Sequence, residues 1–349
     1  MARIKPLTTA ERSALRTEVE AAKQLSSHHL LGMQDLKPEE IKLIMDTAFM
    51  MKNILSIRTK KTAHLQGRSV ITFFAENSTR TRLSFDMACK YLGATTSSIG
   101  ASDASLKKGE NLYDTAKTLE MMSTDILVVR HPQSGAPHYL ASRMDASVVN
   151  AGDGMNEHPT QALLDMMTMI EYKGAIKGLK VAIAGDAMHS RVMRSNVWAL
   201  SKVGAEVRVA APPTMTPRYL DQMPCIVCHD VREACEEVDV IMGLRVQLER
   251  QRSALFPSIN EYAHFFGIDA ECLELARPDA IIMHPGPCNH GVEMPTYIHE
   301  HERSVIHEQV ANGVAVRMAV LFLLNAKRNA KRAELELLEI QSDTDQIDY

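Results

Sequence analysis

The 349-residue sequence contains few aromatic residues and little excess charge. Phe, Trp and Tyr make up only 5% of the chain, so aliphatic side chains and the 21 methionines must fill most of the core. A formal net charge of −4 does not favour general binding to nucleic acid or to a membrane surface. An anionic ligand would therefore have to be bound by a local cluster of cationic side chains.

The sequence also lacks signals for export and for membrane insertion. Its N-terminus has no apolar segment of the kind found in secretory signals. The apolar run MAVLFLL, residues 318–324, is too short to span a membrane. The 6 cysteines are scattered, which suits free thiols in a reducing compartment better than a disulfide framework. We therefore expect a cytoplasmic protein.

Three motifs that could indicate a cofactor are incomplete. CIVCH, residues 225–229, matches the pattern of c-type haem attachment, but it has neither an export signal nor the second cysteine pair of a zinc site. YIHEHERSVIH, residues 297–307, fits a charged loop or helix face better than a metal site. VAIAGD, residues 181–186, lacks the remaining glycines of a dinucleotide-binding motif. We expect no metal and no organic cofactor.

Segments typical of strands alternate with segments typical of helices. We predict strands at 69–75, 125–130, 146–150, 180–185, 206–211, 238–243 and 279–283. We predict helices from Pro38 onward and at 80–92, 109–122, 158–172, 191–203 and 313–325. This alternation predicts an α/β fold with parallel sheets flanked by helices. A boundary between two such units lies in or near the helix that begins at Pro159 and ends at Gly174.

The stretch ENSTRTRLSF, residues 76–85, lies where a predicted strand meets a predicted helix. The first N–H groups of a helix lack partners and attract anions, and hydroxyl groups and Arg80 add further donors there. The stretch therefore suits a phosphate site without the glycines of a P-loop. A Ser/Thr helix cap followed by solvated arginines is the alternative.

Polar side chains follow several other predicted strands: Arg130 and His131; His158 and Gln161; Asp186, His189 and Arg191; Arg245 and Gln247; and residues 284–287. Ligands of open parallel sheets bind outside the carboxyl ends of the strands. This set has few carboxylates and no pair of nucleophile and base. It suits the binding of anions and the polarisation of a carbonyl better than covalent catalysis.

Six motifs in this order resemble the catalytic chains of the aspartate carbamoyltransferase family: STRTR (78–82), RHPQ (130–133), HPTQ (158–161), GDAMHSR (185–191), RVQ (245–247) and HPGP (284–287). The resemblance extends from about His29 to about Leu324. It implies transfer of the carbamoyl group of carbamoyl phosphate to L-aspartate, an early step of pyrimidine biosynthesis. It also implies two α/β domains with the final helix returning to the first domain.

The resemblance divides the chain into four parts and implies how it assembles. These are an N-terminal arm (1–28), a carbamoyl phosphate-binding domain (29–157 plus 312–330), an aspartate-binding domain (158–311) and a charged tail (331–349). Catalytic chains of the family form trimers whose active sites are shared between subunits. Regulatory or dihydroorotase chains are possible further partners, whereas nucleic acid and membrane are not expected.

The resemblance also assigns roles to the residues of the motifs. The residues implied to bind the phosphate are Ser78, Thr79, Arg80 and Thr81. Those implied to polarise the carbonyl oxygen or bind the amide are Thr81, Arg130, His158 and Gln161. Those implied to hold the aspartate carboxylates are Arg191, Arg245 and Gln247. Those implied to complete the substrate site are Gly286 and Pro287, together with Ser105 and Lys108 from a loop of the neighbouring subunit.

Two positions depart from the family pattern. Ser105 stands three residues before Lys108, whereas some members have a longer spacing. His290 stands where related chains usually carry arginine, so the charge of this loop becomes dependent on pH.

Two other functions remain open from the sequence. A sibling enzyme could carbamoylate ornithine or another amino acid, although two arginines in the second half favour a dicarboxylate. A non-catalytic homologue could bind anions without turnover, but it would be expected to have lost one of Arg80, Lys108, Arg130 or His158.

Overall fold

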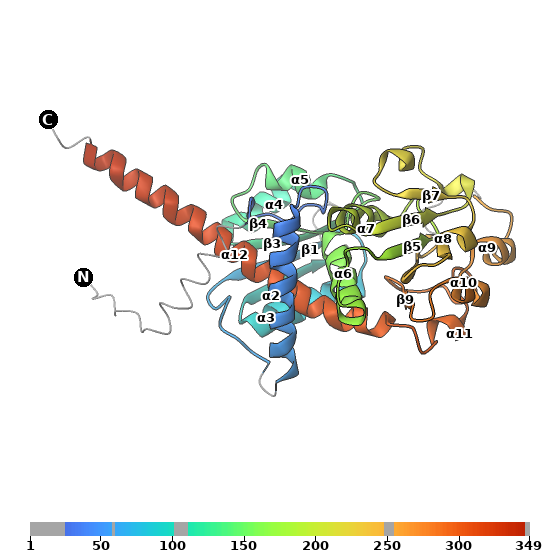
Figure 1. Cartoon of the computed structure of the whole chain (residues 1–349). Coiled ribbons are helices and arrows are strands. Elements are labelled where there is room, and N and C mark those ends of the chain that lie inside the picture. Colours follow the sequence, from blue (N-terminus) through green and yellow to red (C-terminus); the bar gives the residue numbers. More distant parts are fainter. Residues whose placement is uncertain (1–24, 58–59, 101–110, 248–254, 346–349) are drawn as a thin grey trace.

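The computed structural model describes residues 25–57, 60–100, 111–247 and 255–345, with side chains described as far as Lys331. Two parallel sheets, each flanked by helices, lie next to each other along the molecule (Figure 1). This arrangement confirms the predicted α/β fold with two parallel sheets. Ser105 and Lys108 fall outside the described residues, as do most of the predicted N-terminal arm and the last four residues of the tail.

The first sheet has the strand order β2-β1-β3-β4 and the second has the order β7-β6-β5-β8-β9. The strands of the first sheet are β1 (Ser69–Phe74), β2 (Thr95–Gly100), β3 (Ile126–His131) and β4 (Ser147–Asp153). Those of the second are β5 (Lys180–Ala184), β6 (Glu206–Ala210), β7 (Ile226–Cys228), β8 (Val240–Gly243) and β9 (Ile281–Met283). In each sheet the order in which strands are added reverses at one point, between β1 and β3 in the first sheet and between β5 and β8 in the second. Ligands of such folds bind at these points.

Sequence periodicity predicted every strand of these sheets except β2 and β7. The β2 segment, TTSSIG, is polar and largely exposed, and its position depends on pairing with the buried strand β1. β7 has only three residues. Strand pairing in the folded protein decides both segments, which explains why local sequence patterns did not identify them.

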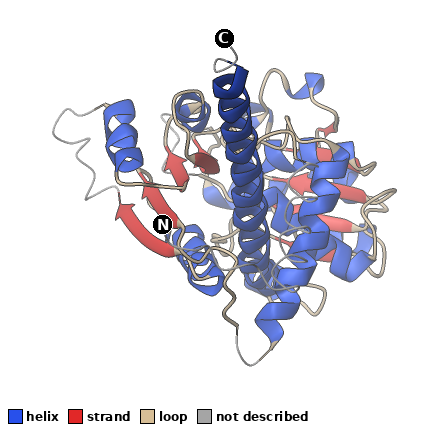
Figure 2. Ribbon diagram, turned by 90° about the vertical axis from the view of Figure 1, so that its left-hand side faces the viewer, coloured by secondary structure: helices blue, strands red, loops and turns tan. Residues whose placement is uncertain are grey.

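The helices cover the faces of the two sheets (Figure 2). Those associated with the first sheet are α2 (Pro38–Ser56), α3 (Thr79–Leu92), α4 (Leu112–Met121) and α5 (Ala136–Ala141). Those associated with the second are α7 (Arg191–Lys202), α8 (Val231–Cys235), α9 (Ile259–Phe266), α10 (Ala270–Leu275) and α11 (Thr296–His299). α6 (Pro159–Lys173) contacts α2, α7 and α12 (Ile306–Asp345), and therefore lies where the two halves meet.

The final helix, α12, returns from the second half and packs against α2, α3 and α6. It begins before the predicted segment 313–325 and continues to Asp345, so the helix extends through most of the charged tail. Residues 306–331 form a helical segment long and apolar enough to span a membrane. However, 83% of its apolar 18-residue stretch is buried inside the protein. These residues therefore serve as a core helix of the fold.

Candidate functional site

A cavity of about 570 Å³ lies between the two sheets at the carboxyl ends of their strands. It is lined by residues predicted from the sequence: Ser78, Thr79, Arg80, Thr81, Arg130, His158, Gln161, Arg191, Arg245, Gln247, Gly286 and Pro287. The two predicted residues not found there, Ser105 and Lys108, lie outside the described part of the chain. Motifs separated by as many as two hundred residues thus meet in one site.

The N-terminus of α3 forms one wall of the cavity. Ser78 is the N-cap residue in an extended conformation, but its side chain does not cap the helix. No acidic residue occupies the first turn, so the positive end of the helix is not neutralised from within. Thr81 is buried beside it. The amides and hydroxyls of this turn can therefore bind an anion.

Arg80 extends from this helix toward the second half of the molecule. Burial and the nearby charge of Arg245 lower the pKa of the Arg80 guanidinium. Gly286, which has a φ of +63°, lies directly against it: a Cβ added to Gly286 would be 2.2 Å from Arg80 Nη1. The loop after β9 thus holds Arg80 at close range, and two like charges from different halves of the molecule meet in the cavity. Such an arrangement favours an anion between them.

Glu76 links two further arginines across the cavity. Its carboxylate accepts two hydrogen bonds from Arg191, from Nη1 to Oε2 at 2.9 Å and from Nη2 to Oε1 at 3.0 Å. Arg130 Nη2 donates to the same Oε1 at 3.4 Å. Glu76 follows β1 and Arg130 lies near the end of β3 in the first sheet, whereas Arg191 begins α7 of the second half. This carboxylate therefore connects the two halves at the site.

His158 is the N-cap residue of α6 and is only 4% exposed. Burial, followed by the charges of Arg130, Arg191 and Arg317, lowers the pKa of His158 well below its ordinary value. Its imidazole is therefore neutral at physiological pH and can donate one hydrogen bond. Among the described residues, no hydrogen-bond partner reaches its Nδ1 atom. A neutral donor of this kind suits a developing negative charge on a carbonyl oxygen.

A buried carboxylate supports the glutamines of the site. Asp165 accepts hydrogen bonds from Gln161 at 2.9 Å and from Gln309 and Asn196 at 2.8 Å each. Burial raises the pKa of Asp165 to about 6. Gln309 in turn accepts a hydrogen bond from the backbone N–H of His284 at 2.9 Å. Helices α6 and α12 and the loop after β9 are thus joined behind the cavity.

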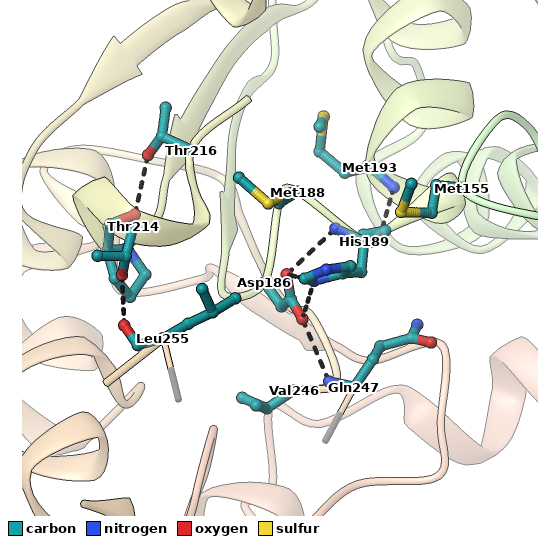
Figure 3. A network of polar contacts seen from close by, with 12 residues as sticks. Met155, Asp186, Met188, His189, Met193, Thr214, Thr216, Val246, Gln247 and Leu255 are labelled. Atoms are coloured by element: carbon teal, nitrogen blue, oxygen red, sulfur yellow. Dashed lines mark hydrogen bonds and ion pairs between the residues drawn. The ribbon is translucent and has the colours of Figure 1, made fainter. Parts of the chain in front are cut away.

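A second buried carboxylate, Asp186, connects the loops of the second half (Figure 3). Its Oδ1 atom lies 2.9 Å from His189 Nδ1, and its Oδ2 atom accepts a hydrogen bond from the backbone N–H of Gln247 at 3.3 Å. His189 precedes Ser190, which caps α7 by accepting from Met193 N–H at 3.1 Å. Asp186 therefore joins the start of α7 to the loop that carries Gln247.

Sequence reasoning missed several residues that line the cavity, including Glu76, Ser84, Gln309 and Arg317. Arg317 was detectable, since it is a single cation in the apolar stretch of α12. It is 3% exposed and donates to Ser84 Oγ at 2.9 Å. The signal for Glu76 and Gln309 is weaker, because their roles depend on partners distant in sequence. The departure at His290 lies outside the described cavity lining, where its ring packs against His299 with centroids 4.8 Å apart.

One group of side chains has the composition of a metal site. The ligand atoms of His284, Cys288 and Glu293 all lie within 4.8 Å of one another. However, His284 Nδ1 accepts a hydrogen bond from Gly286 N–H at 2.8 Å, which leaves the proton of the neutral ring on Nε2. A metal-binding histidine normally donates from its second nitrogen instead. The group therefore fits a hydrogen-bonded support better than a metal centre.

Two of the three motifs considered for a cofactor in the sequence have structural explanations. Cys225 directly precedes the short strand β7 and Cys228 is its last residue, and burial raises the pKa of the Cys225 thiol to about 11. All six cysteines are unbridged thiols. The segment 297–307 forms α11, a turn and the start of α12. Its His299 makes edge-to-face contacts with the rings of His290 and His307.

The cavity has a strong excess of positive charge. Five arginines contribute to its wall, namely Arg80, Arg130, Arg191, Arg245 and Arg317, whereas Glu76 is the only carboxylate among the described lining residues. Oriented amides, hydroxyls and one neutral imidazole complete it. The fold and the site define a two-part α/β protein whose cavity suits anionic substrates and a developing charge on an oxygen.

Comparisons with known proteins identify the family. Residues 28–171 match the aspartate/ornithine carbamoyltransferase carbamoyl-P binding domain, and residues 177–324 match the Asp/Orn binding domain of that family. The chain belongs to the aspartate/ornithine carbamoyltransferase family.

Individual relatives include enzymes from several organisms. The aspartate carbamoyltransferase catalytic subunit of Ruminiclostridium cellulolyticum is 57% identical over 87% of this chain and 97% of its own length. That of Acetivibrio thermocellus is 58% identical with the same coverage. Among solved structures, Pyrococcus furiosus ornithine carbamoyltransferase has a TM-score of 0.77 at 31% identity, covering 86% of this chain and 97% of that one. Trypanosoma cruzi aspartate transcarbamoylase bound to N-(phosphonacetyl)-L-aspartic acid has a TM-score of 0.77 at 30% identity, covering 86% and 96%.

Proposed function

We propose that this protein transfers the carbamoyl group of carbamoyl phosphate to the amino group of L-aspartate. The products are N-carbamoyl-L-aspartate and phosphate, and the reaction is an early step of pyrimidine biosynthesis. The observation that carries this proposal is the strongly cationic cavity between the two sheets, with one carboxylate among its described lining residues. A phosphorylated substrate and a dicarboxylate repel each other, and arginines offset that repulsion while fixing their relative approach.

In this mechanism the first half binds carbamoyl phosphate. The N-terminal turn of α3 and Arg80 hold the phosphate, and Gln161 binds the amide. Thr81, Arg130 and His158 donate hydrogen bonds to the carbonyl oxygen. The amine of aspartate attacks the carbonyl carbon, the bond from carbon to the phosphate oxygen breaks, and phosphate can accept the proton lost by the amine. Loss of a single donor to the developing oxyanion typically costs about 3 kcal/mol.

The second half supplies the groups for aspartate. Arg191, Arg245 and Gln247 are proposed to hold its carboxylates, and Gly286 and Pro287 to complete the wall. The two arginines reach the cavity from α7 and from the loop after β8. They favour a substrate with two carboxylates over ornithine, which carries one carboxylate and two amines. The high identity to several aspartate carbamoyltransferase catalytic subunits supports the same choice.

A direct test compares the two amino acids. We expect rapid formation of N-carbamoyl-L-aspartate from carbamoyl phosphate and aspartate, and no citrulline from ornithine. Arg245→Ala should raise the KM for aspartate much more than the KM for carbamoyl phosphate. Citrulline formation would support the sibling activity, whereas binding of both substrates without turnover would support the non-catalytic alternative.

The proposed assembly is a cytoplasmic homotrimer with active sites shared between subunits. The designation of relatives as catalytic subunits supports an oligomer. Within each chain, we propose that 29–157 with 312–330 binds carbamoyl phosphate and that 158–311 binds aspartate. The position of α6, in contact with helices of both halves, supports a boundary in or near this helix. Ser105 and Lys108 are proposed to reach the site of a neighbouring chain.

A further inference from the structure

A buried carboxylate lies directly behind the loops that line the second half of the cavity. Glu293 is 1% exposed and is not among the residues that line the cavity. Its Oε1 atom accepts a hydrogen bond from the backbone N–H of Asn289 at 2.6 Å and lies 3.4 Å from His284 Nε2. A polar side chain at this depth is costly unless surrounding groups contact it. The contacts of Glu293 therefore indicate what it supports.

One set of contacts leads to the loop after β9. His284 Nδ1 accepts from Gly286 N–H, which places the ring proton on Nε2, and Nε2 lies 3.4 Å from Glu293 Oε1, a close polar contact without hydrogen-bond geometry. Burial lowers the pKa of His284, which keeps the ring neutral. The imidazole thus connects Glu293 to the backbone at Gly286, the residue against which Arg80 packs. This set of contacts is the first of two arms that lead away from Glu293, and it ends at the proposed phosphate site.

A second set of contacts leads to the loop after β8. The Asn289 side chain donates from Nδ2 to the carbonyl oxygen of Val246 at 3.1 Å. Val246 lies between Arg245 and Gln247, both of which line the cavity (Figure 3 shows Val246 and Gln247). Because Glu293 fixes the Asn289 backbone, it also fixes the position of this bond. This arm ends at the proposed aspartate site.

We propose that Glu293 is a positioning residue that holds the loops after β8 and β9 in the positions that both substrate sites require. The Glu293 carboxyl suits the position, since its Oε1 atom accepts from the Asn289 amide and lies close to the His284 ring. The thiol of Cys288 lies beside the same group, and burial, with the charge of Glu293, raises the pKa of this thiol to about 12. The assignment of the two arms to particular substrates rests on the function proposed above.

The two arms make different predictions for two variants. Asn289→Ala removes only the bond to Val246, so the KM for aspartate should rise about tenfold while the affinity for carbamoyl phosphate stays within about twofold. Glu293→Gln keeps the size of the side chain but places amide protons among donors. It should weaken the binding of both substrates, each by about tenfold. Glu274→Gln, on the exposed face of α10, makes the same chemical change away from the site and should alter neither constant.

Steady-state kinetics, calorimetric titration with carbamoyl phosphate and a thermal melt separate positioning from general destabilisation. The double variant should be no worse for aspartate than Glu293→Gln alone, because both changes break the same arm. The proposal is overturned if Glu293→Gln leaves both constants within twofold of wild type. It is also overturned if Asn289→Ala weakens the binding of both substrates equally. The same holds if the effects of the two changes on the KM for aspartate are additive in the double variant.

Hydrogen exchange of the substrate-free protein provides a readout that does not depend on the reaction. Glu293→Gln should increase exchange in peptides covering 243–247 and 284–290, while Glu274→Gln should not. Unchanged exchange in both peptides would overturn the positioning role. If these changes occur but wild-type protein does not carbamoylate aspartate, the proposed function is wrong and the positioning role stands.

Discussion

Replacing Gly286 with alanine should displace Arg80 from the phosphate site. The added Cβ would lie 2.2 Å from Arg80 Nη1 and 2.7 Å from Cζ. Ordinary contact begins at 3.4 Å, so the guanidinium must move by roughly 3.4 − 2.2 = 1.2 Å if the backbone stays in place. The displaced group, the Arg80 guanidinium, is proposed to bind the phosphate. The perturbation therefore acts on the site without removing any side chain from it.

The magnitude follows from this displacement. A misplacement of about 1 Å in a group that positions substrate can lower the rate by about 100-fold. We therefore expect Gly286→Ala to reduce kcat/KM for carbamoyl phosphate by about 100-fold. The left-handed backbone at Gly286 adds a cost of about 1–2 kcal/mol to folding stability. Initial rates, calorimetric titration and a thermal melt would measure the two effects separately.

Gly291 provides a matched control in the same part of the chain. It has a φ of +79°, similar to that of Gly286, but an added Cβ would meet no atom within 4 Å. Gly291→Ala should therefore lower stability to a similar extent while leaving affinity for carbamoyl phosphate unchanged. Equal losses of affinity in the two variants would refute the reasoning, because they would trace the effect to backbone strain rather than to displacement of Arg80.

Other features of the site make further predictions. Glu76→Gln should raise the KM for aspartate about tenfold in steady-state assays, because Arg191 loses its charged acceptor; an unchanged KM would count against this link. The Asp165 carboxylate becomes protonated below a pKa of about 6, so kcat/KM should fall as pH drops through 6. Asp165→Asn should have a lower but flat profile there, and persistence of the acid limb would exclude Asp165 as its source. Inactive Lys108→Ala and His158→Ala chains should regain turnover when dissociated and reassembled together, and lack of recovery in hybrids verified by native mass spectrometry would place each site within one chain.

Local sequence patterns predicted the elements whose identity is set locally. The β1 run of β-branched and aromatic residues is buried as expected, and α3 ends at Gly93, whose φ of +79° suits glycine. The predicted helix from Pro159 to Gly174 also has those limits. Short elements such as β7, and the polar edge strand β2, were missed. Their conformations depend on neighbours that are distant in sequence.

The cavity shows a similar division between local and long-range information. Motifs at strand ends identified four of the five arginines and the helix terminus, because parallel strands bring their carboxyl ends to one edge. They did not identify Glu76 as a partner of Arg191, a residue 115 positions away in the sequence. Nor did they identify Gln309, which joins Asp165 to His284 from the first turns of α12. These residues act through pairings that only the packed structure creates.

The topology explains why the site requires both halves of the chain. The strand order of each sheet reverses once, and each reversal brings only some of the substrate-binding groups to the edge of its sheet. The β1/β3 reversal supplies the α3 terminus and Arg130, while the β5/β8 reversal supplies Arg191 and Arg245. Facing cations would repel each other if no anion separated them. Glu76 partly offsets this repulsion in the protein itself, and the anionic substrates proposed above would offset the rest.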